Sequence, residues 1–124
     1  MKKVLVVDDD QDILELAKAA LGKHYEIVTG TSGKECLGLI GPERPDLIIL
    51  DVIMAHLGDG LDCLKSLKAD PASQKIPVMM MTSVNDVYDY RSQIEASFYP
   101  HDRWLDKPVK SDVLLKAVRE MLGD

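Results

Sequence analysis

Aspartates that follow two short apolar segments are the residues best suited to chemistry in this chain. Asp8, Asp9 and Asp10 directly follow one aliphatic segment, and Asp51 directly follows another. Continuous aliphatic segments of this length are typical of strands buried on both faces of a parallel sheet. In an open parallel sheet, ligands bind beyond the carboxyl ends of the strands. We therefore expect these carboxylates to share one pocket.

The chemistry expected of such a pocket is phosphoryl transfer. Crowded carboxylates repel one another unless a cation is present, and oxygen ligands suit Mg²⁺. A carboxylate beside Mg²⁺ can also attack phosphorus as a nucleophile. Thr82 follows the apolar segment 76–81, and Lys107 follows a short segment around Trp104. A hydroxyl group and a cation at the same sheet edge would bind phosphate oxygens, which favours transfer of a phosphoryl group to Asp51.

The apolar periodicity alternates between that of strands and that of helices along the whole chain. Strands are expected at residues 4–7, 25–29, 46–50, 76–81 and around 104–105. Five helices are expected between and after them: from an N-cap at Asp10 to a stop at Gly22, through Cys36 to Ile40 with an end at Gly41-Pro42, around 61–68 with an end before Pro71, at about 86–96, and at 113–122. This order predicts an α/β fold with a parallel sheet covered on both faces.

Length and composition are those of a soluble globular protein. The 124 residues are enough for one domain with a real core. The net charge of −6 argues against non-specific binding to nucleic acid or to an anionic membrane. No signal peptide or membrane-spanning segment is evident, and a cytoplasmic location is expected. Cys36 and Cys63 lack metal-site spacing and are expected to be reduced, partly buried thiols.

Several motifs, taken together and in order, resemble the receiver domain of bacterial two-component response regulators, including the single-domain chemotaxis type. The resemblance covers nearly the whole chain. It rests on Val6 to Asp10, Gly33-Lys34-Glu35, Pro45 to Asp51, Met54, Asp59-Gly60, Thr82-Ser83 and Lys107-Pro108. The resemblance implies one receiver domain over residues 1–124. It also implies a three-layer, doubly wound, flavodoxin-like fold with five parallel strands in the order 2-1-3-4-5.

The resemblance implies a phosphoacceptor and a metal site. Asp51 would accept a phosphoryl group, and Mg²⁺ would be bound by Asp9, Asp51 and the main-chain carbonyl of Ile53. Asp8 would contribute partly through water. The chain would be a signalling domain, with no enzymatic activity beyond its own phosphorylation and dephosphorylation.

The resemblance also implies a phosphate-binding group and a switch. Thr82, Lys107 and the main-chain N–H of Ser83 would contact the phosphate oxygens. Thr82 and Trp104 occupy the positions of the family's switch residues, and the Lys107–Pro108 peptide bond would be cis.

The implied partners are proteins. A sensor histidine kinase or a histidine phosphotransfer protein would supply the phosphoryl group, and a downstream protein target would bind the switched face. Direct binding to nucleic acid or to a membrane is not expected, and the chain would be a monomer or a weak phosphorylation-dependent dimer. The chain departs from the family pattern at Ala55, in place of proline, and in the segment 95–103, which contains Phe98-Tyr99-Pro100.

Other interpretations remain open at this stage. The chain could be the receiver part of a larger hybrid kinase or transcriptional regulator. An aspartate-dependent phosphatase resembling the haloacid dehalogenase group would need a second acid where this chain has Ile53, and a flavodoxin-like cofactor carrier could share the fold. A receiver used only for binding is disfavoured by intact Asp9, Asp51, Thr82 and Lys107. Residues 79–81, all methionine, are expected to fill the core, and His24, His56 and His101 are expected at the surface.

Overall fold

A five-stranded parallel sheet forms the centre of the computed structural model, which describes residues 1–51, 59–82, 96–98 and 100–124. The strands are β1 (Lys3–Val7), β2 (Glu26–Gly30), β3 (Leu47–Asp51), β4 (Val78–Thr82) and β5 (Arg103–Asp106). Their order in the sheet is β2-β1-β3-β4-β5, and every neighbouring pair is parallel. The doubly wound, flavodoxin-like α/β fold expected from the sequence is therefore confirmed.

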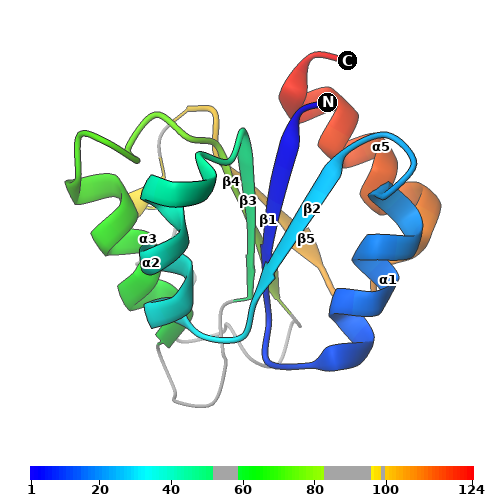
Figure 1. Ribbon diagram of the computed structural model, residues 1–124, viewed down its shortest axis with the longest axis horizontal. Coiled ribbons are helices and arrows are strands. Elements are labelled where there is room, and N and C mark those ends of the chain that lie inside the picture. Colours follow the sequence, from blue (N-terminus) through cyan, green and yellow to red (C-terminus); the bar gives the residue numbers. More distant parts are fainter. Residues whose placement is uncertain (52–58, 83–95, 99) are drawn as a thin grey trace.

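Helices cover both faces of the sheet (Figure 1). The helices are α1 (Gln11–Leu21), α2 (Gly33–Glu43), α3 (Asp59–Ala69) and α5 (Ser111–Leu122). Helices α1 and α5 lie side by side on one face, and α2 and α3 lie side by side on the other. The helix expected at 86–96 falls almost wholly on residues outside the described part. No helix of the described part is both long and apolar enough to cross a membrane.

The alternation of side chains along the central strands builds two cores, one on each face of the sheet. Val4 and Val6 pack with residues of α1 and α5, whereas Leu5 and Val7 pack with residues of α2 and α3. Strands β1 and β3 are buried on both faces, which explains their unbroken aliphatic sequences. The methionines at 79–81 are fully or almost fully buried, as predicted.

Local sequence explains where α1 begins and ends. The carboxylate of the N-cap Asp10 accepts a hydrogen bond from the Asp12 N–H at 2.9 Å, which satisfies one of the free donors at the helix start. Gly22 ends the helix in a right-handed conformation, and a Cβ there would lie 2.5 Å from the Lys18 carbonyl oxygen. Both ends of this helix agree with the prediction.

The predicted end of the second helix at Gly41-Pro42 is wrong. Helix α2 continues to Glu43 with Pro42 inside its last turn, and Arg44 caps it in the left-handed conformation with φ 47°. The Arg44 N–H donates to the Ile40 carbonyl at 3.0 Å, so the chain closes the last turn beyond the proline. A proline interrupts a helix by removing one N–H donor and by clashing with the preceding turn. Here the proline lies in the final turn, so only the end of the helix is affected.

The chain termini are joined by a small polar cluster. The Lys2 ammonium donates to the Asp124 carboxylate and to the Leu122 carbonyl, each at 2.8 Å. The Tyr25 hydroxyl donates to the same carboxylate at 2.7 Å. Burial raises the pKa of Tyr25 to about 12, and the hydrogen bond to Asp124 adds to the effect. The cluster links the end of α5 to the strands on which its face packs.

A buried ion pair joins α3 to the start of β5, at the sheet edge opposite the aspartates. The Lys68 ammonium lies 2.9 Å from the Asp102 carboxylate, and these side chains are only 5% and 0% exposed. Lys68 also donates to the carbonyls of Gln74 and Ile76, and the Val78 N–H donates to Asp102 at 2.8 Å. The pair therefore fixes the turn between α3 and β4 against the strand β5.

Candidate functional site

The register of the sheet brings the predicted acidic residues together at its carboxyl edge. Strands β1 and β3 are neighbours, with Val7 opposite Leu50, so Asp8 and Asp51 are the next residues along each strand. The Asp8 N–H donates to the Gly30 carbonyl at 3.1 Å, which holds the chain against the end of β2 as it leaves β1. Two adjacent strands thus deliver carboxylates to one place.

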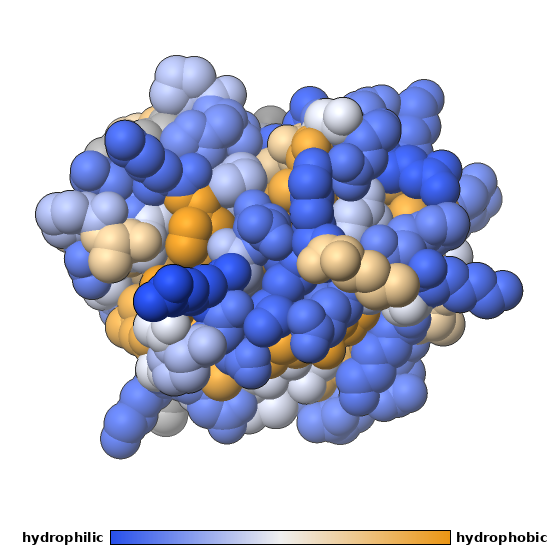
Figure 2. Space-filling view, turned by 45° about the horizontal axis from the view of Figure 1, so that its top comes forward, coloured by the Kyte–Doolittle hydropathy of each residue, from blue (hydrophilic) through white to orange (hydrophobic). Residues whose placement is uncertain are grey.

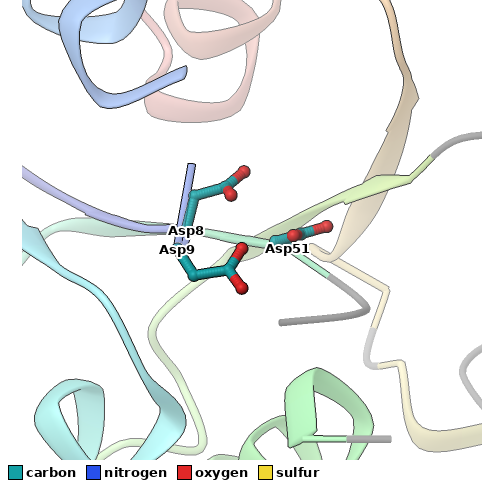
Figure 3. A group of neighbouring side chains, drawn as sticks. All are labelled: Asp8, Asp9 and Asp51. Carbon is teal, nitrogen blue, oxygen red and sulfur yellow. The ribbon is translucent and has the colours of Figure 1, made fainter. Parts of the chain in front are cut away.

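Three carboxylates form a cluster at this edge. Each of Asp8, Asp9 and Asp51 offers one oxygen atom, and these atoms lie within 4.8 Å of one another. Figure 3 shows Asp8 and Asp9 extending from the end of β1 toward the side where Asp51 lies. Asp8 and Asp51 are buried, whereas Asp9 is exposed. A ligand can therefore approach from the side of Asp9.

Lys107 places a positive charge between the two buried carboxylates. Its ammonium nitrogen lies 3.1 Å from Asp8 and 3.2 Å from Asp51, and its side chain is 19% exposed. Burial by itself would lower the pKa of Lys107, but the charges of Asp51 and Asp8 and their hydrogen bonds outweigh it and raise the pKa. Lys107 is therefore a protonated, positively charged group at neutral pH. It precedes Pro108 through a cis peptide bond, as the resemblance implied.

Asp8 is held in place by two donors. One of its oxygens accepts from the Asp10 N–H at 2.9 Å, and the other accepts from Lys107. Asp9 makes no hydrogen bond or ion pair to any other described residue, so its oxygens are available to a ligand. Asp10, the third aspartate of the series, serves as the N-cap of α1.

The remaining predicted site residues are described only in part. Thr82 is the last residue of β4, one position beyond Met81, which pairs with Asp51 across the sheet. The main chain of Thr82 therefore reaches the same edge as the acidic cluster. Ile53, Ser83 and His56 lie outside the described residues.

Trp104 is partly buried and contacts Phe98, a residue of the segment 95–103. Phe98 lies against Trp104 with ring centroids 5.9 Å apart and an interplanar angle of 76°, an edge-to-face contact. Both rings pack against the core on the α2 and α3 face. Phe98 belongs to the segment recognised as unusual in sequence, but nothing in the sequence pattern indicated this contact.

The chemistry of the donor set fits a divalent cation with a preference for oxygen. Three carboxylates supply hard ligands, and one of them is exposed and has no competing partner in the described part. Two of the three carboxylates share the charge of Lys107, which leaves net negative charge for a bound cation.

Comparison with known proteins agrees with this arrangement. The model of the response regulator receiver domain family matches residues 4–119. The protein PhoP of Bacillus subtilis, an alkaline phosphatase synthesis transcriptional regulatory protein, is 37% identical over an alignment of 124 positions that covers 98% of this chain and 48% of PhoP. The response regulator PleD of Caulobacter vibrioides is 32% identical over 96% of this chain and 26% of its own length. This chain thus spans about half or less of these curated relatives.

Two solved structures match this chain over almost their full length. The chemotaxis response regulator CheY4 of Vibrio cholerae superposes with a TM-score of 0.84 at 30% identity, covering 98% of this chain and 99% of that one. A putative response regulator from Chloroflexus aurantiacus has a TM-score of 0.83 at 28% identity, covering 99% and 98% of the two chains. Receiver domains are signalling domains that generally bind Mg²⁺ at an acidic pocket. The chain belongs to the response regulator receiver domain family.

Proposed function

We propose that this chain is a phosphoacceptor switch in which Asp51 receives a phosphoryl group from a phosphohistidine. The observation that carries the proposal is the position of the Asp51 carboxylate, buried beside Lys107 and within the acidic cluster. A carboxylate oxygen of Asp51 attacks the phosphorus, a P–O bond forms, and the bond from phosphorus to the donor nitrogen breaks. The released histidine keeps the electron pair of that bond and takes up a proton.

The residues around Asp51 stabilise the charge that moves during this step. Lys107 already contacts Asp51, so its ammonium group can follow the negative charge onto the phosphoryl oxygens. Asp8, Asp9, Asp51 and the carbonyl of Ile53 would hold Mg²⁺, which supplies charge neutralisation of the phosphoryl oxygens when it is bound. Thr82 and the main-chain N–H of Ser83 complete the proposed phosphate contacts.

The output of this reaction is a change in protein binding. A signalling role fits the family, and the proposed donor is a sensor histidine kinase or a histidine phosphotransfer protein. Thr82 and Trp104 are the proposed switch residues. In this structure Trp104 packs against Phe98. Phosphorylation would shift the population toward a conformation in which this contact is changed. The downstream target is proposed to be a protein, and the proposed location is the cytoplasm.

Incubation with acetyl phosphate and Mg²⁺ tests the proposal. We expect the wild type to gain one phosphoryl group, measured by intact-protein mass spectrometry, and Asp51→Asn to gain none. Chelation of Mg²⁺ should abolish the gain. Asp106→Asn is the matched control, because Asp106 is an exposed aspartate at the same sheet edge that lies outside the acidic cluster. Equal phosphorylation of Asp51→Asn and the wild type would refute the assignment.

Asp9 is expected to matter more than Asp8 for Mg²⁺ affinity. Asp9 has no competing partner in the described part of the chain, whereas Asp8 is occupied by Lys107 and by the Asp10 N–H. Removal of a direct ligand costs more affinity than removal of a residue that acts through water. We expect Asp9→Ala to bind Mg²⁺ at least about tenfold more weakly than Asp8→Ala. Titration of Trp104 fluorescence or calorimetry measures both, and the reverse order would contradict the claim.

A further inference from the structure

A groove between α2 and α3 carries charges of both signs that have no ion-pair partner among the described residues. Two hollows lie along it, of about 580 Å³ and about 260 Å³. Leu37, a residue of α2 whose surface is 42% exposed, lines both hollows. In Figure 2, apolar surface is visible among polar residues on the left of the molecule, the side where Figure 1 shows α2 and α3. The groove is distinct from the acidic cluster.

The two walls of the groove carry opposite charges. One hollow is lined by Lys34 of α2 and Asp62 of α3, and the other by Arg44, just after α2, and Asp70, just after α3. The wall of α2 is thus basic and the wall of α3 acidic at both ends. None of these four side chains has an ion-pair partner among the described residues, although Asp70 accepts a hydrogen bond from the Ala72 N–H.

This order makes the groove complementary to itself. Helices α2 and α3 run parallel to each other, because each returns the chain from the carboxyl end of one parallel strand to the amino end of the next strand in sequence. A twofold axis along the groove would place α2 of one copy over α3 of the other at the same height. Lys34 would then meet the partner copy's Asp62, and Arg44 would meet its Asp70. A twofold axis that runs across the groove would instead place like charges together. The charges therefore favour the axis along the groove.

The composition of α2 leaves room for such a partner. A Cβ added at Gly38 or Gly41 would meet nothing within 4 Å, so packing within the chain does not require either glycine. Glycine inside a helix weakens it relative to alanine. Gly41 lines the larger hollow, and the absence of a side chain there lets a second helix approach closely.

We propose that two copies of this chain associate through the grooves between α2 and α3, in a parallel twofold dimer with Leu37 of each copy against the partner. The association is weak, because two helices of 11 residues are only about 16 Å long and the face they form is small for a stable complex. It does not require phosphorylation.

Sedimentation equilibrium of the unphosphorylated full chain tests this dimer. From about 1 μM to about 1 mM protein, the average mass should rise from 13.8 kDa toward twice that value, and added salt should weaken the rise. Leu37→Ser should raise the dissociation constant at least about tenfold. Val113→Ser is the matched control, because Val113 is a 45% exposed apolar residue on α5, and it should leave the constant unchanged.

A charge exchange distinguishes this geometry from other dimers. Lys34→Glu and Asp62→Lys should each weaken the dimer at least about tenfold, because each places two like-charge contacts in the interface. The double variant should recover the wild-type constant within about threefold, because both contacts again join opposite charges. A monomer at every concentration, a dimer insensitive to Leu37→Ser, or a double variant without recovery would overturn the proposal.

Discussion

Replacement of Lys68 by methionine is expected to lower the free energy of unfolding by about 3–5 kcal/mol. Methionine keeps most of the aliphatic volume of lysine but removes the charge. Asp102 would then remain as a carboxylate that is 0% exposed and lacks the ammonium group 2.9 Å away. The carbonyls of Gln74 and Ile76 would lose the same donor. An uncompensated buried charge costs far more than the loss of an exposed ion pair. Urea unfolding followed by circular dichroism measures the change.

Two further variants separate the buried charge from other causes. Arg103→Met breaks the pair with Glu120, whose side chains are 43% and 48% exposed, and should cost no more than about 1 kcal/mol. Combining Lys68→Met with Asp102→Asn removes the orphaned charge and keeps an acceptor for the Val78 N–H, so part of the stability should return. Equal losses for Lys68→Met and Arg103→Met would show that the pair is not effectively buried.

Replacement of Lys107 by methionine is expected to slow phosphorylation from acetyl phosphate by about 10²–10³-fold. The ammonium group lies 3.1 Å from Asp8 and 3.2 Å from Asp51, where it can follow charge onto the phosphoryl oxygens. The raised pKa of Lys107 keeps its side chain protonated at neutral pH. Its removal therefore takes a positive charge away from the site. The initial rate of phosphorylation at saturating Mg²⁺ measures the effect.

The same substitution should not weaken the binding of Mg²⁺. Without the competing ammonium group, Asp8 and Asp51 present more negative charge, so Lys107→Met should bind Mg²⁺ at least as tightly as the wild type. Lys110→Met is the control, because Lys110 is exposed and lies outside the contacts of the cluster. A variant that phosphorylates at the wild-type rate, or that loses Mg²⁺ binding together with the rate, would contradict the role assigned to Lys107.

The sequence predicted the fold because each element carries a local signal. The unbroken aliphatic strands and the amphipathic helices follow from burial on both faces of one sheet, and the cap at Asp10 follows from the free N–H groups at a helix start. Strand boundaries shifted by one or two residues, as at Glu26–Gly30 and Val78–Thr82, because hydrophobicity alone does not determine which residues join the hydrogen-bonded ladder. The order of the strands came from the family resemblance.

Features that depend on contacts between distant residues could not be predicted. The sequence pattern places Lys68 only at the end of the helix expected around 61–68, and its ion pair with Asp102 joins residues 34 positions apart. His101 is exposed, as expected, but its ring nitrogen also lies 3.5 Å from the Lys68 ammonium, a contact that the sequence did not indicate. The extension of α2 beyond Pro42 depends on the left-handed cap at Arg44, a conformation that the sequence pattern does not favour for arginine.

The acidic site could be predicted from the sequence only in part. The placement of Asp8, Asp9 and Asp51 at one edge was expected from their positions after strands. In the structure, one carboxylate oxygen of each lies within 4.8 Å of the other two. The contacts of Lys107 with both buried carboxylates required the three-dimensional fold, because Lys107 and Asp8 are 99 residues apart.

Chemical trapping of the phosphorylated residue tests the central claim most directly. An acyl phosphate is reduced by borohydride, whereas phosphate esters of serine or threonine and unmodified carboxylates are not. After incubation with a phosphorylated histidine kinase or acetyl phosphate in the presence of Mg²⁺, reduction followed by peptide mass spectrometry should find homoserine at position 51 and nowhere else. Homoserine at Asp8, Asp9 or any other aspartate, with position 51 unmodified, would contradict the assignment of Asp51 as the phosphoacceptor.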